Sequence, residues 1–232
     1  FRREPTNQEI SVQAYISLCY GAKHISYYNH TSGDAIACGN KLYDWGITEM
    51  TPNIRDPRTS NYYGQNKFQF VAEQNATLLK LGRYMYDSLN LKYDDSRSFK
   101  TDGVNGTYIE DIKSLYRNAQ QEYLTSNDDV NKYWQFGFFN SDNTIEPNTY
   151  SRYFMAVNRR CAPEDANHNG DIRQLRVKFR TSELSEFNNW NIIDVLQNSI
   201  VATFNKNSGA FVNIGVFQPG SGRLFKLVPV LD

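Results

Sequence analysis

The spacing of apolar residues near the N-terminus predicts a helix with a defined start and stop. Thr6 and Glu9 form a capping box, in which the Thr hydroxyl accepts from the backbone three residues on and the Glu side chain reaches back. Apolar residues then recur with helical spacing over residues 10–19, and Gly21 supplies the stop. A short strand of aromatic and polar residues is predicted to follow over residues 24–30.

The next stretch alternates between irregular and helical patterns. Residues 31–65 are rich in Gly, Asn, Asp, Pro and Thr, which predicts a long loop, and long ordered loops tend to be functional. Apolar positions over residues 68–89 predict a second helix, which Gly82 weakens locally by roughly 1 kcal/mol relative to Ala.

The pattern changes after Asn90 to turn residues and then to short β-like runs separated by turns. Leu175, Val177 and Phe179 alternate with Arg176 and Lys178, the period of two of a half-buried strand. Regular short strands with frequent turns favour a β-sandwich. Residues 108–123 fit either a helix or a strand plus loop. The predicted strands are residues 132–139, 152–158, 172–180, 190–195, 200–204, 210–217 and 223–228.

Composition and charge narrow the partners of this 232-residue chain. The formal net charge is zero and no basic block is present, which argues against nucleic acid. The apolar runs are far shorter than the roughly 18 residues of a membrane span. Aromatic residues make up 14%, which suits β structure and surfaces that stack on sugars. Of the three cysteines, Cys19 and Cys38 could pair in an oxidising compartment, or each could be a small buried apolar residue.

Both ends of the chain resemble bacterial glycoside hydrolases built on a (β/α)8 barrel. Residues 4–28, with EPT, EI, QAY, GAKHI and YY in order, resemble the stretch from the seventh helix to the eighth strand of such a barrel. Residues 153–161 (YFMAVNRRC) and 217–227 (FQPGSGRLFKL) resemble the β-sandwich that often ends those enzymes. The resemblance is specific for architecture and loose for substrate. It also implies an extracellular or periplasmic protein.

The resemblance implies a fold of two parts. Residues 1–92 would be the end of a barrel, arranged as helix, strand, loop and helix, and residues 93–232 an antiparallel β-sandwich domain. A complete barrel takes typically about 250 residues, so it does not fit beside the β structure. The fragment would leave apolar helix faces exposed. We expect these faces either to pack on the sandwich or to meet a partner, namely the missing barrel segment or a second copy.

The same resemblance places the candidate substrate-binding residues at the end of the eighth strand and in the loop behind it. Tyr28, His30 and Trp45 would lie at the mouth of the barrel, where aromatic faces stack on sugar rings and polar groups bond hydroxyls. The alternative is that these aromatic residues pack in the core. The two catalytic carboxylates of a glycosidase would come from strands 4 and 7, upstream of this chain.

Other chemical motifs are weak. Glu4 lies beside the predicted strand end but better serves the N-terminus of the first helix. Residues 165–171 resemble half of a calcium loop, but Arg176 stands where its twelfth residue should be an acid. The sequence therefore predicts no metal site and no cofactor.

Three functions remain open on this basis. The first is the C-terminal portion of a glycoside hydrolase-like protein that acts on or binds oligo- or polysaccharide. The second is a non-catalytic carbohydrate-binding or interaction module, which exposed coplanar aromatic residues on one sandwich face would favour. The third is a hydrolase with a relocated site inside this chain, which would require two carboxylates roughly 5 to 10 Å apart in a cleft.

Overall fold

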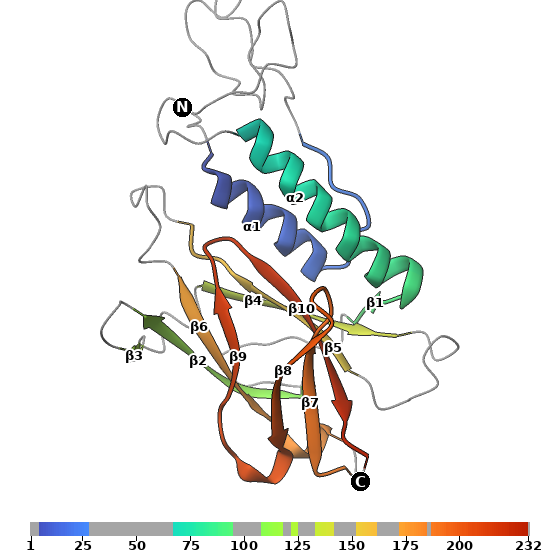
Figure 1. Cartoon of the computed structure of the whole chain (residues 1–232), viewed down its shortest axis with the longest axis vertical. Helices are drawn as coiled ribbons and strands as arrows, with labels where there is room; N and C mark the ends of the chain where they lie inside the picture. The colour runs from blue at the N-terminus through green and yellow to red at the C-terminus, as the bar shows by residue number, and fades with distance from the viewer. Residues whose placement is uncertain are drawn as a thin grey trace, which may run out of the picture.

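The computed structural model describes residues 5–27, 67–94, 108–117, 122–124, 133–141, 152–161, 172–184 and 187–231. These residues form a layer of two helices, a six-stranded sheet and a four-stranded sheet (Figure 1). The helices are α1 (Asn7–Cys19) and α2 (Lys67–Gly82), and α2 continues into the π-helical turn η1 (Arg83–Ser88). None of the described helices is long and apolar enough to cross a membrane.

Every strand pairing described is antiparallel. The larger sheet has the order β1-β4-β5-β10-β7-β8, and the smaller one β3-β2-β6-β9. The strands are β1 (Lys92–Tyr93), β2 (Ile109–Arg117), β3 (Glu122–Leu124), β4 (Trp134–Asn140), β5 (Arg152–Asn158), β6 (Arg173–Phe179), β7 (Asn189–Asp194), β8 (Ser199–Asn205), β9 (Val212–Phe217) and β10 (Gly222–Pro229).

The two sheets face each other across one apolar core, as expected of a sandwich. Ile112, Leu175 and Ile214 reach this core from the smaller sheet, and Phe154 and Phe225 reach it from the larger. The rings of Phe154 and Phe225 stack with centroids 5.2 Å apart. The seven strands predicted from residue 132 onward are all present, and the ambiguous stretch 108–123 forms β2 and β3 rather than a helix.

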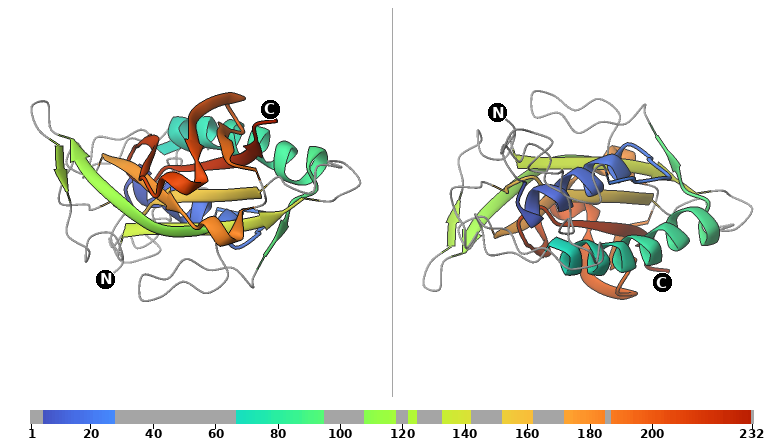
Figure 2. Two further views of the ribbon diagram at one scale, coloured as in Figure 1. Left: turned by 90° about the horizontal axis from the view of Figure 1, so that it is seen from below. Right: turned by 90° about the horizontal axis from the view of Figure 1, so that it is seen from above.

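A second apolar core lies on the other face of the larger sheet, where the helices pack. Viewed from above, α1 lies across this sheet, and it contacts β4, β5 and β10 (Figure 2). Tyr153, Met155 and Val157 of β5 point toward the helices, whereas Phe154 and Ala156 point into the sandwich. This burial on both faces explains why β5 is a continuous apolar run instead of an alternating one.

The ends of α1 are those predicted. Thr6 accepts from the Glu9 amide at 3.1 Å, and the Glu9 carboxylate accepts from the Thr6 amide at 2.9 Å. At the C-terminus Gly21 has φ +77°, its amide donates to the Leu18 carbonyl, and the Ala22 amide donates to the Ser17 carbonyl. These two bonds are a Schellman motif, which only a residue tolerant of positive φ permits.

The structure does not show the barrel fragment expected for the first part of the chain. The strand expected over residues 24–30 is absent from residues 24–27, which are irregular, and residues 28–30 lie outside the described ranges. α1 buries Val12, Tyr15 and Leu18 in the core on the outer face of the larger sheet. This face of α1 therefore packs on the sandwich sheet and not on a barrel strand. The helices thus pack on the sandwich, the first of the two alternatives. The division at residue 92 stays a prediction.

The C-terminal end of α1 also holds Cys19, which is a fully buried free thiol. Its pairing candidate Cys38 lies outside the described residues. Burial raises the pKa of the Cys19 thiol well above its ordinary value, because the thiolate would have to form in an apolar surrounding.

We therefore expect Cys19 to be inert in the folded protein. In a variant with Cys38 and Cys161 replaced by serine, a disulfide reagent such as Ellman's should react at least about a hundredfold more slowly in native buffer than in concentrated guanidinium, because the thiolate is both disfavoured and inaccessible. The absorbance change of the released thiolate gives both rates. Equal rates in the two solvents would show that α1 does not seal this position.

Candidate functional site

The three residues predicted to bind substrate, Tyr28, His30 and Trp45, lie outside the described residues, so their role stays a prediction. Residues 22–27, which lead directly to them, are described. The Schellman motif at the end of α1 turns this segment back along α2. The segment forms one wall of a cleft.

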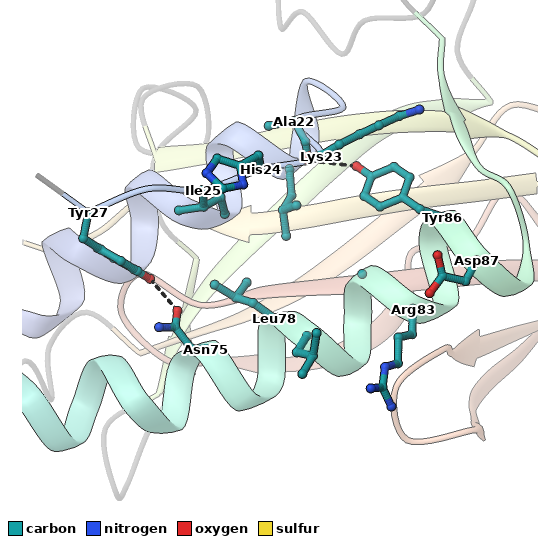
Figure 3. A pocket seen from close by; sticks show the side chains of 13 residues that line it. Ala22, Lys23, His24, Ile25, Tyr27, Asn75, Leu78, Arg83, Tyr86 and Asp87 are labelled. Atoms are coloured by element: carbon teal, nitrogen blue, oxygen red, sulfur yellow. Dashed lines mark hydrogen bonds between the residues drawn. The ribbon is translucent and has the colours of Figure 1, made fainter.

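The cleft lies between residues 22–27 on one side and α2 with η1 on the other (Figure 3). Its volume is about 610 Å³, within the range of small-ligand sites. The two walls run in opposite directions, because Ala22 lies beside Tyr86 and Tyr27 lies beside Asn75. The lining residues are Leu18, Ala22, Lys23, His24, Ile25, Tyr27, Asn75, Leu78, Leu79, Gly82, Arg83, Tyr86 and Asp87.

Two tyrosine hydroxyls tie the walls together near the two ends of the cleft. The Tyr86 hydroxyl donates to the Ala22 carbonyl at 3.0 Å, and the Tyr27 hydroxyl donates to Asn75 Oδ1 at 3.1 Å (Figure 3). Both rings are half-buried. Each hydroxyl is committed to a protein acceptor, so the rings are held in place and what they offer a ligand is mainly an apolar face.

Burial raises the pKa of the Tyr86 and Tyr27 hydroxyls above the ordinary value for tyrosine. Both hydroxyls therefore remain protonated, as the two anchoring hydrogen bonds require, at any pH below that ordinary value of about 10. The geometry of the cleft does not depend on their titration near neutral pH.

The helix that forms one wall of the cleft changes from α-helical to π-helical geometry where α2 passes into η1. The Leu89 amide donates to the Tyr84 carbonyl, five residues back, as expected of the π turn η1. Such turns are rare and occur frequently at functional sites. The predicted helix over residues 68–89 is therefore interrupted at Gly82, and Tyr84 is 41% exposed while Tyr86 lines the cleft.

The cleft has few charged side chains, and they lie on different sides of it. Lys23 Nζ lies 5.6 Å from the centre of the Tyr86 ring. Figure 3 shows the Arg83 guanidinium pointing away from residues 22–27. His24 Nε2 lies 2.6 Å from Ser26 Oγ. Leu18, Ile25, Leu78 and Leu79 supply the apolar lining between these groups.

Glycosidase chemistry needs two carboxyl groups on either side of the bond. Among the described residues that line the cleft, Asp87 is the single carboxylate. Elsewhere in the described ranges Asp194 is buried and paired with Arg223, and Glu9 closes the capping box. No three His, Cys, Asp or Glu side chains gather into a metal-binding group within these ranges. What the described cleft offers is binding by an apolar wall with polar neighbours.

The aromatic residues of the described sandwich do not form an external platform. Phe136, Phe138, Phe154, Trp190 and Phe225 are all buried between the sheets. The described large aromatic residues that are exposed, Tyr20 and Tyr84, belong to the helical layer. The described sandwich therefore lacks the exposed coplanar aromatic residues that would favour a sugar-binding face.

Sequence reasoning identified the segment after α1 and missed the opposite wall. Asn75 and Tyr86 were assigned only to a helix, because nothing in a single sequence tells which helix face meets a segment 48 or 64 residues away. The available signal was Gly82 inside the predicted helix, with two tyrosines and charged residues close behind it.

Comparison with known proteins gives little beyond this. No protein-family model matches the sequence, and no curated protein matches it. Among solved structures, a proposed alpha-N-acetylgalactosaminidase from Bacillus halodurans C-125 is similar over 72% of this chain, with a TM-score of 0.32 and 11% sequence identity. This chain spans 26% of that protein's length.

Proposed function

We propose that the chain is a saccharide-binding portion of a glycoside hydrolase-like protein, and that the cleft between residues 22–27 and α2 with η1 holds part of a sugar chain. The observation that carries the proposal is the pair of Tyr86 and Tyr27, whose rings are fixed by their hydroxyls at the two ends of the cleft. The apolar face of a pyranose ring suits such a ring, while Asn75 and Asp87 suit its hydroxyls.

The described cleft alone does not supply the carboxylates that hydrolysis of a glycosidic bond requires. Asp87 alone does not supply the acid and the nucleophile or base of hydrolysis. We therefore propose that this chain positions the sugar and that the two carboxylates come from another segment of the protein. Tyr28, His30 and Trp45 would extend the binding surface from the end of the described segment, and an extracellular or periplasmic location belongs to the same proposal.

The test is binding of a panel of oligosaccharides to the chain and to two tyrosine variants, measured by isothermal titration calorimetry. Tyr86→Ala should weaken binding of the best ligand by about tenfold, because it removes both the ring and the bond that holds the opposite wall. Tyr84→Ala is the matched control, because Tyr84 lies on the same turn, is exposed and does not line the cleft.

Circular dichroism of both variants shows whether the fold is kept. Absence of binding to every sugar of the panel at millimolar concentration would contradict the proposal. So would an equal loss in Tyr84→Ala and Tyr86→Ala, because the cleft would then not be the site.

A further inference from the structure

We infer that the saccharide bound in this cleft is acidic, with its carboxylate or sulfate group facing Lys23. This inference rests on the proposed function and specifies its ligand. The chain as a whole carries no net charge, so the preference has to come from the local arrangement of charged groups.

Lys23 is the charged group best placed to meet a ligand. It is exposed and lies on the wall formed by residues 22–27, and its ammonium group lies 5.6 Å from the centre of the Tyr86 ring on the other wall. A sugar ring stacked beside Tyr86 would therefore bring its substituents within reach of this ammonium group (Figure 3).

Lys23 also has no carboxylate partner in the described part of the chain. Two other cations there have one: Lys178 Nζ lies 2.6 Å from Glu110 Oε1, and Arg223 Nε lies 2.8 Å from Asp194 Oδ2. An ammonium group that faces an aromatic ring without an internal counter-ion remains available to a ligand anion. Such a charge-assisted bond is roughly twice as strong as one between neutral groups.

The remaining charges of the cleft do not reverse this balance. Two further fixed charges line the described cleft, namely the carboxylate of Asp87 and the guanidinium of Arg83, and both come from η1. The described lining therefore carries two fixed cations against one carboxylate, and Lys23 is the fixed cation on the wall formed by residues 22–27.

The experiment compares oligosaccharides of equal length that differ in one substituent: an oligouronate, its neutral methyl ester, a sulfated oligosaccharide and its desulfated form. Titration calorimetry at low and at physiological salt should give about tenfold tighter binding of an acidic sugar than of its neutral partner. The preference should shrink as salt rises, because the interaction lies near the surface. The acidic sugar that shows the preference identifies the group as carboxylate or sulfate.

Lys23→Met keeps much of the apolar stem and removes the charge. It should therefore reduce the ratio of affinities for the acidic and the neutral sugar to about one, while binding of the neutral sugar changes little. Lys80→Met is the matched control, because Lys80 is an exposed lysine of α2 that does not line the cleft. Equal affinity of acidic and neutral sugars, or a preference that survives in Lys23→Met, would overturn the inference and leave the proposed function standing. Absence of binding to all four sugars would also overturn the inference, whereas the proposed function falls only if every sugar of the panel fails to bind.

Discussion

Replacing Gly137 by alanine should lower the free energy of unfolding by about 3 kcal/mol, although it adds one methyl group. A Cβ at this position of β4 would lie 2.6 Å from the Cα and 2.8 Å from the carbonyl carbon of Cys19, and closer still to its carbonyl oxygen. These are backbone atoms at the end of α1, so no side chain can rotate away. The helix itself would have to move off the sheet.

The measurement is urea denaturation followed by fluorescence, together with amide hydrogen exchange of residues 7–19. We expect lost protection in α1 and retained protection between the sheets. Gly82→Ala is the matched control, because a Cβ there has no neighbour within 4 Å and the residue is helical, with φ −59°. Alanine should stabilise that position by roughly 0.5–1 kcal/mol. A Gly137→Ala variant as stable as the parent would show that α1 does not dock this closely.

Replacing Arg223 by methionine should destabilise the sandwich by about 3 kcal/mol. Arg223 Nε donates to Asp194 Oδ2 at 2.8 Å, within the larger sheet, and its Nη1 donates at 3.3 Å to the carbonyl of Ile214 in the smaller sheet. Asp194 is 2% exposed, so removing its partner leaves a charge in a place from which water is excluded. Gly215, at φ +113°, leaves the space that the guanidinium fills.

A double-mutant cycle with Asp194→Asn measures the coupling, and we expect it to be about 2 kcal/mol. The asparagine can still accept from the Gln197 amide, as Asp194 Oδ1 does at 2.9 Å, so the turn after β7 is kept. The control is Lys178→Met, which breaks the exposed pair with Glu110 and should cost less than about 1 kcal/mol. Equal effects of Arg223→Met and Lys178→Met would mean that the inner pair is as well solvated as the outer one.

The strands were predictable because each carries its own signal. The alternation of Leu175, Val177 and Phe179 with charged residues marks β6, and the turn residues around it mark its ends. The helix α1 was predictable for the same reason, because Thr6, Glu9 and Gly21 act on the backbone within a few residues of themselves.

The structure does not show the expected barrel fragment, and the contact that decides where α1 packs is not local. Apolar residues in a helix signal that part of the helix is buried, but they do not signal which segment covers them. The structure places this part of α1 on β4, β5 and β10, more than 100 residues away in sequence. The fully apolar run of β5 was the relevant clue, because a strand buried on both faces needs a further layer beyond the sandwich.

Local chemistry was therefore enough to specify the capped first helix, most strand positions and the turn that sends residues 22–27 away from it. Which surfaces meet was decided in three dimensions: Cys19 against Gly137, Arg223 across the two sheets, and Tyr86 against Ala22 to close the cleft. The reason is that hydrogen bonds within a few residues are encoded where they form. Packing between distant segments instead depends on shape and burial that arise only when all the layers are together.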